Sequence, residues 1–278
     1  SDVCSSDLAE MLASSGPVLC AAVFFLGFVV VSVIESYRPR ARLVAPLGRR
    51  WIANIGLYLL YFVLFAAAGD VPYTFVFWGE SYGIAALAGL HPGLAVVLGI
   101  VAADVVRYWS HRLHHAVPFL WRLHEIHHTD RDLDVTTTMR HHPLEGASMW
   151  LVTAAAYTLL GVPLLAIVLY EVIATALSTI QHANLRVPPA LETALARVLV
   201  TPDTHRIHHS LRPDEGNANF GIVSSIWDRL FGTHVALDAQ AHERLAFGVA
   251  GAHATEDRLP LILLAPFLPS TRRANLPT

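Results

Sequence analysis

The chain of 278 residues contains no lysine, only two cysteines and few charged residues. Asp, Glu and Arg together make up 15% of it, whereas a soluble domain carries about 25% charged residues. The mean hydropathy is +0.47, and the net charge of −3 offers no basic surface for nucleic acid. This composition indicates an integral membrane protein and gives no reason to expect a nucleic-acid partner.

The two cysteines, Cys4 and Cys20, are too few for a disulfide framework, a zinc ribbon or an iron–sulfur site. All 19 basic residues are arginine, which we interpret as a GC-rich, bacterial coding sequence. Residues Ser1–Leu8 read like the translation of a sequencing adapter, so we expect them to be non-native and exclude them from fold reasoning.

Long apolar runs dominate the first two thirds of the chain. Pro17–Ile34 has about the length of a membrane-spanning helix, and we expect Ile52–Ala68 to run outward and Leu94–Trp109 to return inward. Gly161–Pro163 divides a further block, Ala147–Thr179, into two segments of roughly 15 to 17 residues, which are short of the about 20 that a span needs. We therefore expect a hairpin that dips into the membrane, and an all-α helical bundle with about four transmembrane segments.

Arginines between Arg38 and Arg50 follow the first run at once, and this bias places the loop in the cytoplasm. The chain before Pro17 is then outside, and Asn184–Thr278 is inside. The expected organisation is a transmembrane region over residues 9–110, a catalytic domain over 104–233 and a cytoplasmic tail over 234–278. The clustered histidines would form a helical cap on the cytoplasmic side of a bacterial inner membrane.

Most of the 16 histidines fall in clusters at helical spacing. H-R-L-H-H spans His111–His115, H-E-I-H-H spans His124–His128 and H-R-I-H-H spans His205–His209. Positions i, i+3 and i+4 of a helix share a face, so we expect each triplet to converge on one point. Imidazole is the commonest metal ligand among side chains and suits iron, zinc and copper. The sequence therefore predicts a two-metal site.

Two other interpretations compete with an oxygenase. H-E-I-H-H matches the zinc-protease pattern, with His124 and His128 as ligands and Glu125 as base. The other two units carry arginine where that base would stand, and a zinc hydrolase needs far fewer histidines. A non-catalytic metal carrier would place ionisable residues in its spans, and Pro17–Ile34 has none.

A series of motifs runs from Asp104 to Thr233: D-V-V-R-Y-W-S-H-R-L-H-H, L-W-R-L-H-E-I-H-H, R-H-H-P-L-E, T-P-D-T-H-R-I-H-H, N-F-G and W-D-R-L-F-G-T. In order and spacing this series resembles the fatty acid hydroxylase/sterol desaturase superfamily. The resemblance implies a membrane-bound non-haem di-iron centre held by histidines. It also implies the use of O2 and two electrons to hydroxylate or desaturate a lipid such as a fatty acyl chain, sterol, alkylglycerol or carotenoid.

The resemblance further implies ten metal ligands and a set of neighbouring groups. We expect two iron ions, with zinc as a substitute in isolated protein, and a separate electron donor of the ferredoxin or cytochrome type. His141 is expected to face away from the metals. The expected ligands are His111, His115, His124, His127, His128, His142, His182, His205, His208 and His209, and the expected supporting residues are Asp104, His114, Glu145, Asp203 and Asp228.

Overall fold

The computed structural model describes residues 15–68, 90–250 and 257–268. The predicted adapter residues 1–8, most of the stretch between the second and third apolar runs and the end of the cytoplasmic tail lie outside these ranges. Within them the chain is all-α, as expected, with three isolated backbone bridges and no strand. The long helices are α2 (Gly16–Tyr37), α3 (Leu47–Ala68), α5 (Pro92–Ala116), α7 (Pro143–Leu160) and α8 (Leu164–Gln181).

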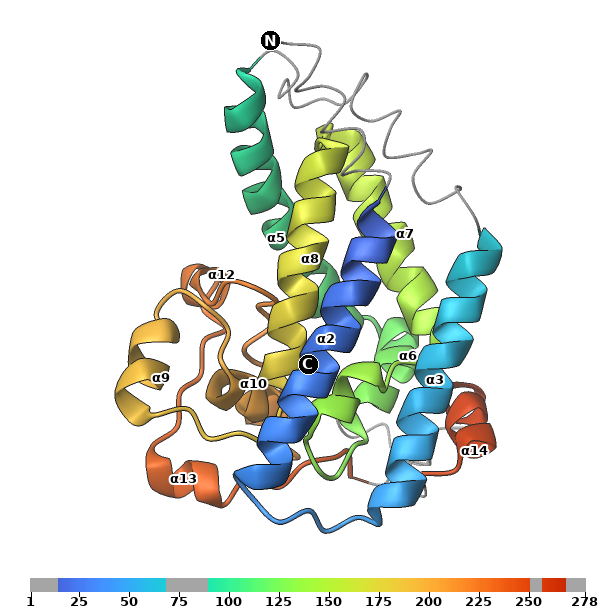
Figure 1. Cartoon of the computed structure of the whole chain (residues 1–278), viewed down its shortest axis with the longest axis vertical. Coiled ribbons are helices and arrows are strands. Elements are labelled where there is room, and N and C mark those ends of the chain that lie inside the picture. The colour runs from blue at the N-terminus through green and yellow to red at the C-terminus, as the bar shows by residue number, and fades with distance from the viewer. Residues whose placement is uncertain (1–14, 69–89, 251–256, 269–278) are drawn as a thin grey trace.

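Short helices gather around one half of this bundle, at the end where α2 leads into α3 (Figure 1). Proline stands at the first or second position of most of them, because its fixed φ suits the first helical turn and it has no amide hydrogen to leave unpaired there. They are α6 (Pro118–His128), η2 (Val135–Met139), α9 (Pro189–Leu195), α10 (Pro202–His208), α11 (Pro213–Gly216), α12 (Ile226–Leu230), α13 (Ala239–Glu243), α14 (Leu259–Leu264) and η4 (Ala265–Phe267).

Four helices of the described chain, α2, α3, α5 and α8, are long and apolar enough to cross a membrane. At most 39% of the apolar window of any of them is buried inside the protein. Large apolar side chains face outward instead, such as Val18 at 71%, Leu26 at 68% and Val63 at 64% exposure. Water would penalise so much exposed apolar surface, whereas lipid accepts it. The number of spans agrees with the sequence prediction.

The hairpin between α7 and α8 forms with its turn where expected. Gly161 has φ +66° and ends α7 in the left-handed conformation that glycine adopts without strain, and Pro163 precedes the start of α8. Each arm is longer than predicted, at 18 residues, because both helices continue into polar residues at their histidine-bearing ends. As a result, α8 is long enough to cross the membrane by itself.

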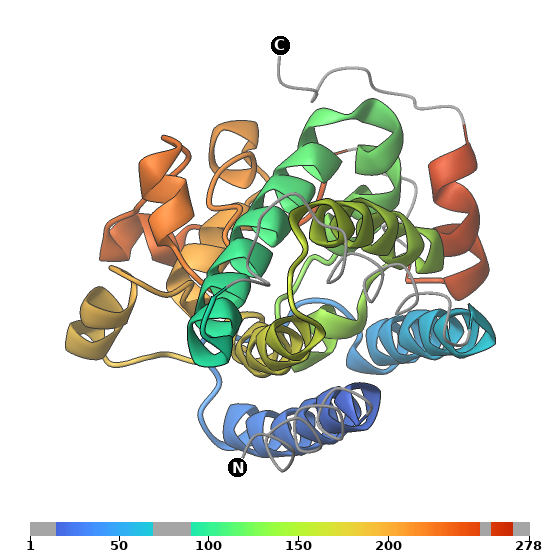
Figure 2. The ribbon, with the colours of Figure 1, turned by 90° about the horizontal axis from the view of Figure 1, so that it is seen from above.

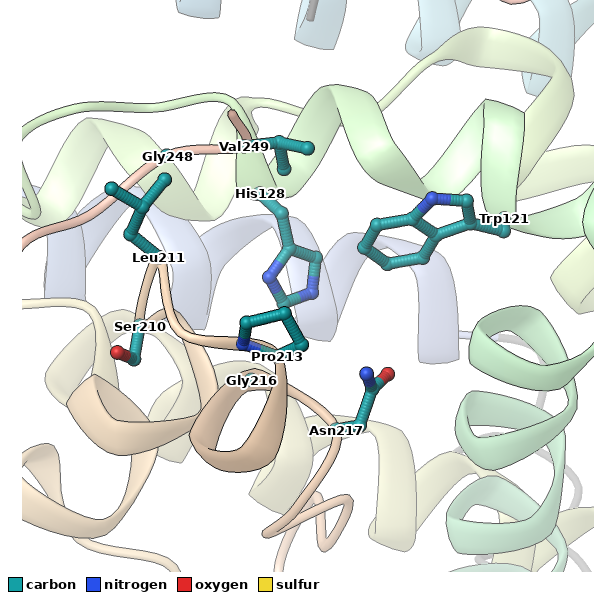
Figure 3. A pocket seen from close by; sticks show the side chains of 9 residues that line it. All are labelled: Trp121, His128, Ser210, Leu211, Pro213, Gly216, Asn217, Gly248 and Val249. Carbon is teal, nitrogen blue, oxygen red and sulfur yellow. The ribbon is translucent and has the colours of Figure 1, made fainter. Parts of the chain in front are cut away.

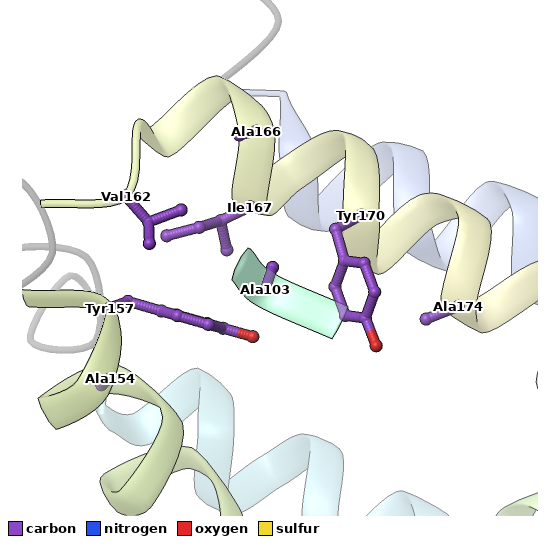
Figure 4. Packing of buried hydrophobic residues seen from close by; sticks show 8 residues of the cluster. All are labelled: Ala103, Ala154, Tyr157, Val162, Ala166, Ile167, Tyr170 and Ala174. Carbon is purple, nitrogen blue, oxygen red and sulfur yellow. The ribbon is translucent and has the colours of Figure 1, made fainter. Parts of the chain in front are cut away.

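Seen from above, α5, α7 and α8 stand side by side (Figure 2). Small and aromatic side chains fill the space between them, among them Ala103, Ala166, Tyr157 and Tyr170 (Figure 4). The helices approach closely at Gly99, where an added Cβ would lie 2.6 Å from the Cβ of Ala166. Small residues allow membrane helices to approach this closely, and the packing contacts that result hold the helices together.

A buried ionic network that the sequence analysis did not foresee joins the bundle to the histidine-rich end. Arg50 of α3 is fully buried and donates to Asp130 at 3.0 Å, to Asp134 and to the carbonyl of Asp132 at 2.8 Å. Glu35 at the end of α2 accepts from the backbone amides of Val135 and Asn184. These contacts fix α2 and α3 against the loop that leads into η2, next to the histidines.

Candidate metal centre

The clustered histidines meet at one end of the bundle, carried by α5, α6, the end of α8 and α10. They form two groups, in each of which the ligand nitrogens lie within 4.8 Å of one another. Every member is at most 4% exposed. The first group is His111, His115, His124, His128 and His208, and the second is His127, His182, His205 and His209.

The sequence triplets are divided between the two groups, which corrects the expectation that each triplet converges on one point. His124 and His128 belong to the first group and His127 to the second; His208 belongs to the first group, while His205 and His209 belong to the second. The reason is geometric. A helix turns by about 100° per residue, so positions i and i+4 nearly coincide while i+3 points well to one side. Each triplet therefore contributes to two neighbouring points.

Within each group the Nε2 atoms face one another. The Nε2 of His124 lies 3.1 Å from that of His111 and 3.1 Å from that of His128. In the second group, the Nε2 atoms of His182 and His205 are 2.9 Å apart. Ligand nitrogens at about 2.0–2.1 Å from a common ion are separated by about this distance. These are spacings that a metal ion would fill.

In six of the nine members the other ring nitrogen, Nδ1, faces an acceptor outside the groups. The Nδ1–H groups of His111 and His208 donate to the carbonyls of Phe220 at 2.9 Å and Ala218 at 2.7 Å. His124 donates to the carboxylate of Glu145 at 2.7 Å. Such outer bonds fix the tautomer and the ring orientation of metal-binding histidines. The inward Nε2 of His208 is buried without a partner among the described residues, as expected for an atom reserved for a metal.

Burial keeps these imidazoles neutral. Loss of hydration lowers the pKa of His208 to about 3 and that of His182 to about 4. The pKa values of His127 and His128 are also lowered well below the ordinary range, first by burial and then by neighbouring histidines. Only the neutral ring can offer a lone pair to a metal. The cluster is therefore ready to bind cations at neutral pH.

The two groups are in direct contact. The rings of His128 and His209, from different groups, are stacked with centroids 4.6 Å apart. The ring centroids of His127 and His128 are 5.6 Å apart, and those of His208 and His209 are 5.5 Å apart, again between members of different groups. Two ions held by these groups would therefore be neighbours, which is the arrangement needed for joint chemistry on one small molecule.

The adjacent histidines His141 and His142 have the opposite orientations to those expected. His142 lies outside both groups: its Nδ1 accepts from the amide of Leu144 as the N-cap of α7, and its Nε2 faces the carbonyl of Leu263. His141 instead stacks on His127 with ring centroids 4.1 Å apart and donates to Glu145 at 2.8 Å. The demand for a cap at Pro143 decides which of the two rings turns away.

Glu145 and His114 occupy supporting positions, as expected. One carboxylate oxygen of Glu145 accepts from both His124 and His141, and the side chain is 3% exposed. His114 stands beside the first group without joining it, since its nitrogens bond to the carbonyl of Ser110 and the hydroxyl of Ser148.

The three aspartates expected to support the histidines do not touch them. Asp104 accepts hydrogen bonds from two backbone amides of the loop after α11 and so holds that loop. It also accepts from the side chains of Trp227 and Tyr170, which lie on α12 and α8. Asp228 accepts from the amides of Phe220 and Gly221, and so shapes the turn whose carbonyl receives His111. Asp203 pairs with Arg40. Their effect on the site is indirect, because each orders a loop or helix that carries a histidine or its acceptor.

Sequence reasoning missed several groups that contact the histidines. Asn217 accepts from the Nδ1 of His115 at 3.3 Å, and Trp121 lies 4.9 Å from the ring of His115 and 5.4 Å from that of His128. Most of the other acceptors are backbone carbonyls, which leave no signature in the sequence. Glu125, the base of the zinc-protease interpretation, belongs to none of the metal-binding groups found among the described residues.

Residues 96–233, which include every histidine of both groups, match the fatty acid hydroxylase family. The chain belongs to this family. It is similar to an ornithine lipid hydroxylase of Rhizobium tropici, at 32% identity over 67% of this chain and 53% of that protein. It also resembles human alkylglycerol monooxygenase, at 28% identity over 54% of this chain and 32% of the relative.

Human cholesterol 25-hydroxylase is a further relative, at 26% identity over 76% of this chain and 78% of that protein. The chain thus spans about half or less of the length of the ornithine lipid hydroxylase and the alkylglycerol monooxygenase. No solved structure matches it significantly.

Proposed function

We propose that the protein is a membrane-bound lipid hydroxylase that uses O2 and external electrons at a non-haem di-iron centre. The observation that carries this proposal is the pair of adjacent histidine groups, with Nε2 atoms turned inward and most Nδ1 atoms held by outer acceptors. Soft thiolate ligands are absent from these groups, and imidazole suits iron. The iron ions, when bound, would supply the activation of O2.

The chain's own residues supply orientation and exclusion of water. Four separate helical segments hold the rings in place, and carbonyls or carboxylates fix the tautomers. The burial of every ligand candidate keeps bulk water from the centre, which protects a reactive oxidant. We propose that the electrons come from a separate ferredoxin-type or cytochrome-type reductase.

We propose hydroxylation in preference to desaturation, because the relatives are named hydroxylases and monooxygenases. The molecules in their names, ornithine lipid, alkylglycerol and cholesterol, share a long hydrocarbon part and a polar end. The apolar faces of α2, α3 and α5 are largely exposed, which suits a position in the lipid bilayer. Such a lipid would be found in the same bilayer. A hydrocarbon substrate would therefore reach the histidines from the bilayer.

The bundle end that carries the histidines also carries the arginine-rich loop between α2 and α3. By the positive-inside bias, we propose that this end faces the cytoplasm of a bacterial inner membrane. A soluble reductase could then dock on the same side as the metal centre.

The proposal is tested by comparing the lipids of cells that express the wild-type chain, His115→Ala or His114→Ala. Wild-type cells should accumulate a lipid heavier by one oxygen atom. His115 is a member of the first group, so its loss should abolish that product and reduce the iron content of the purified protein. Among the described residues the His114 ring bonds to Ser110 and Ser148 and belongs to neither group, so His114→Ala should keep its metal and part of its turnover.

Two outcomes would contradict the proposal. If His114→Ala loses its metal while His115→Ala keeps it, the assignment of ligands on α5 is wrong. If no oxygenated lipid forms but Glu125→Gln abolishes a hydrolytic activity, the chain is a zinc hydrolase, since Glu125 serves no role in the di-iron proposal.

A further inference from the structure

A small hollow lies beside His128 of the first histidine group, and none of its lining residues belongs to a helix that could cross the membrane (Figure 3). Its cavity volume is about 30 Å³. A water molecule needs roughly 10–15 Å³ of such volume, so the hollow suits a water-sized molecule and is far too small for a lipid chain. The lining includes Trp121, His128, Leu211, Pro213, Asn217 and Val249.

His128 is the member of the first group that this hollow reaches. In the described chain, the other four members each have an Nδ1 acceptor: carbonyls for His111 and His208, and side chains for His115 and His124. The Nε2 of His128, by contrast, bonds to that of His124, and its Nδ1 has no acceptor among the described residues. The ring is 3% exposed, yet it lines the hollow.

A metal-binding histidine almost always donates its second N–H to a carboxylate, a carbonyl or a water molecule. We expect a molecule in the hollow to accept the second N–H of the His128 ring. Figure 3 shows the side-chain amide of Asn217 pointing toward the space between His128 and Trp121, where it offers a second polar contact. The remaining wall is largely apolar, through Leu211, Pro213 and Val249. This combination suits a small molecule that must be held briefly and then exchanged.

We propose that this hollow binds one exchangeable water-sized molecule beside His128, and that it is the entry by which water, O2 and small anions reach the first histidine group. Lipid, which cannot fit there, arrives from the membrane side, so the two substrates use separate routes. The inference rests on the metal centre of the proposed function. It adds a route by which small molecules reach the first group.

Azide binding to cobalt-loaded protein tests the entry without any turnover. Leu211 is 39% exposed at the rim, and its backbone is fixed by a bond from its amide to the carbonyl of Ala246 at 2.7 Å. Leu211→Trp should narrow the rim and slow azide association, followed by stopped-flow absorbance, by about tenfold. Leu211→Ala should not slow it. Leu230→Trp is the matched control, since Leu230 is 65% exposed on α12 and does not line the hollow.

Cobalt content and the absorption spectrum before azide addition establish that each variant keeps its centre. Equal association rates in wild type, Leu211→Trp and Leu230→Trp would overturn the inference, as would failure of cobalt-loaded wild type to bind azide. If the protein takes up no metal at all, the proposed function fails. The entry route can then be tested by O2 quenching of Trp121 fluorescence, which is identified as the difference from Trp121→Phe. Quenching that Leu211→Trp does not reduce would then overturn it.

Discussion

Glu145 offers the sharpest test of how the first histidine group is held. Its Oε1 accepts from the Nδ1 of His124 at 2.7 Å and from that of His141 at 2.8 Å, and its Oε2 accepts from the backbone amide of His142 at 3.3 Å. Glu145 is 2% exposed, so water cannot readily take the place of its carboxylate as a hydrogen-bond acceptor. Removing it leaves the buried imidazole N–H of His124 and that of the half-buried His141 without this acceptor.

The magnitude follows from these contacts. A hydrogen bond to a charged group contributes about 1.5–3 kcal/mol, and loss of an outer partner of a metal ligand typically weakens metal binding by about 10–100-fold. Glu145→Ala should therefore weaken binding at the first group by about 1.4–2.7 kcal/mol. Glu145→Gln should fall between wild type and alanine, because the amide oxygen can still accept from His124 while its NH2 group meets the N–H of His142.

The assay is metal retention during titration with a chelator, measured by elemental analysis of the protein after desalting. Glu35→Gln is a matched control, since Glu35 is a buried carboxylate that accepts backbone amides and touches no histidine. We expect Glu35→Gln to lower thermal stability and leave the chelator midpoint in place. If Glu145→Ala releases its metal at the same chelator concentration as wild type, the support assigned to Glu145 is wrong.

Two further predictions concern pH and orientation. Burial lowers the pKa of His208 to about 3 and that of His182 to about 4, while unfolded histidine titrates near 6.5. Below pH 6.5 the unfolded chain therefore binds more protons than the folded chain. Metal-free protein should lose stability progressively as the pH falls from about 6.5 to 3, which thermal unfolding at each pH would measure. Constant stability over this window would contradict the buried neutral state. A cysteine introduced as Arg42→Cys should be labelled by a membrane-impermeant maleimide only after the inner membrane is opened, and labelling from the periplasmic side of intact membranes would reverse the proposed topology.

Sequence patterns of short range were sufficient for much of this protein. Hydrophobic runs predicted the spanning helices, Gly161 and Pro163 predicted the hairpin turn, and the helical spacing of the histidines predicted a metal centre. The quoted motifs predicted the family. Each of these depends on residues close together in the chain, where helix periodicity, glycine conformation and apolar length act locally.

The same reasoning was less successful wherever the answer depended on another element. His142 was expected among the ligands, but it caps α7, while His141 takes the place against His127. The aspartates expected to support the ligands instead hold loops, and the fully buried Arg50 had no recognisable partner in the sequence. Capping needs, loop packing and burial determine these contacts, and none of them follows from local spacing.

The sequence by itself thus determined the chemical type of the site: neutral imidazoles, in number sufficient for two ions, beside membrane helices. Only the tertiary structure decided how the triplets divide between two groups, because that depends on which face of α6 and α10 meets α5 and α8. Only the tertiary structure, too, placed His128 against a water-sized hollow. Helix geometry fixes the direction of each ring on its own helix, but the packing of helices far apart in the chain fixes what that ring meets.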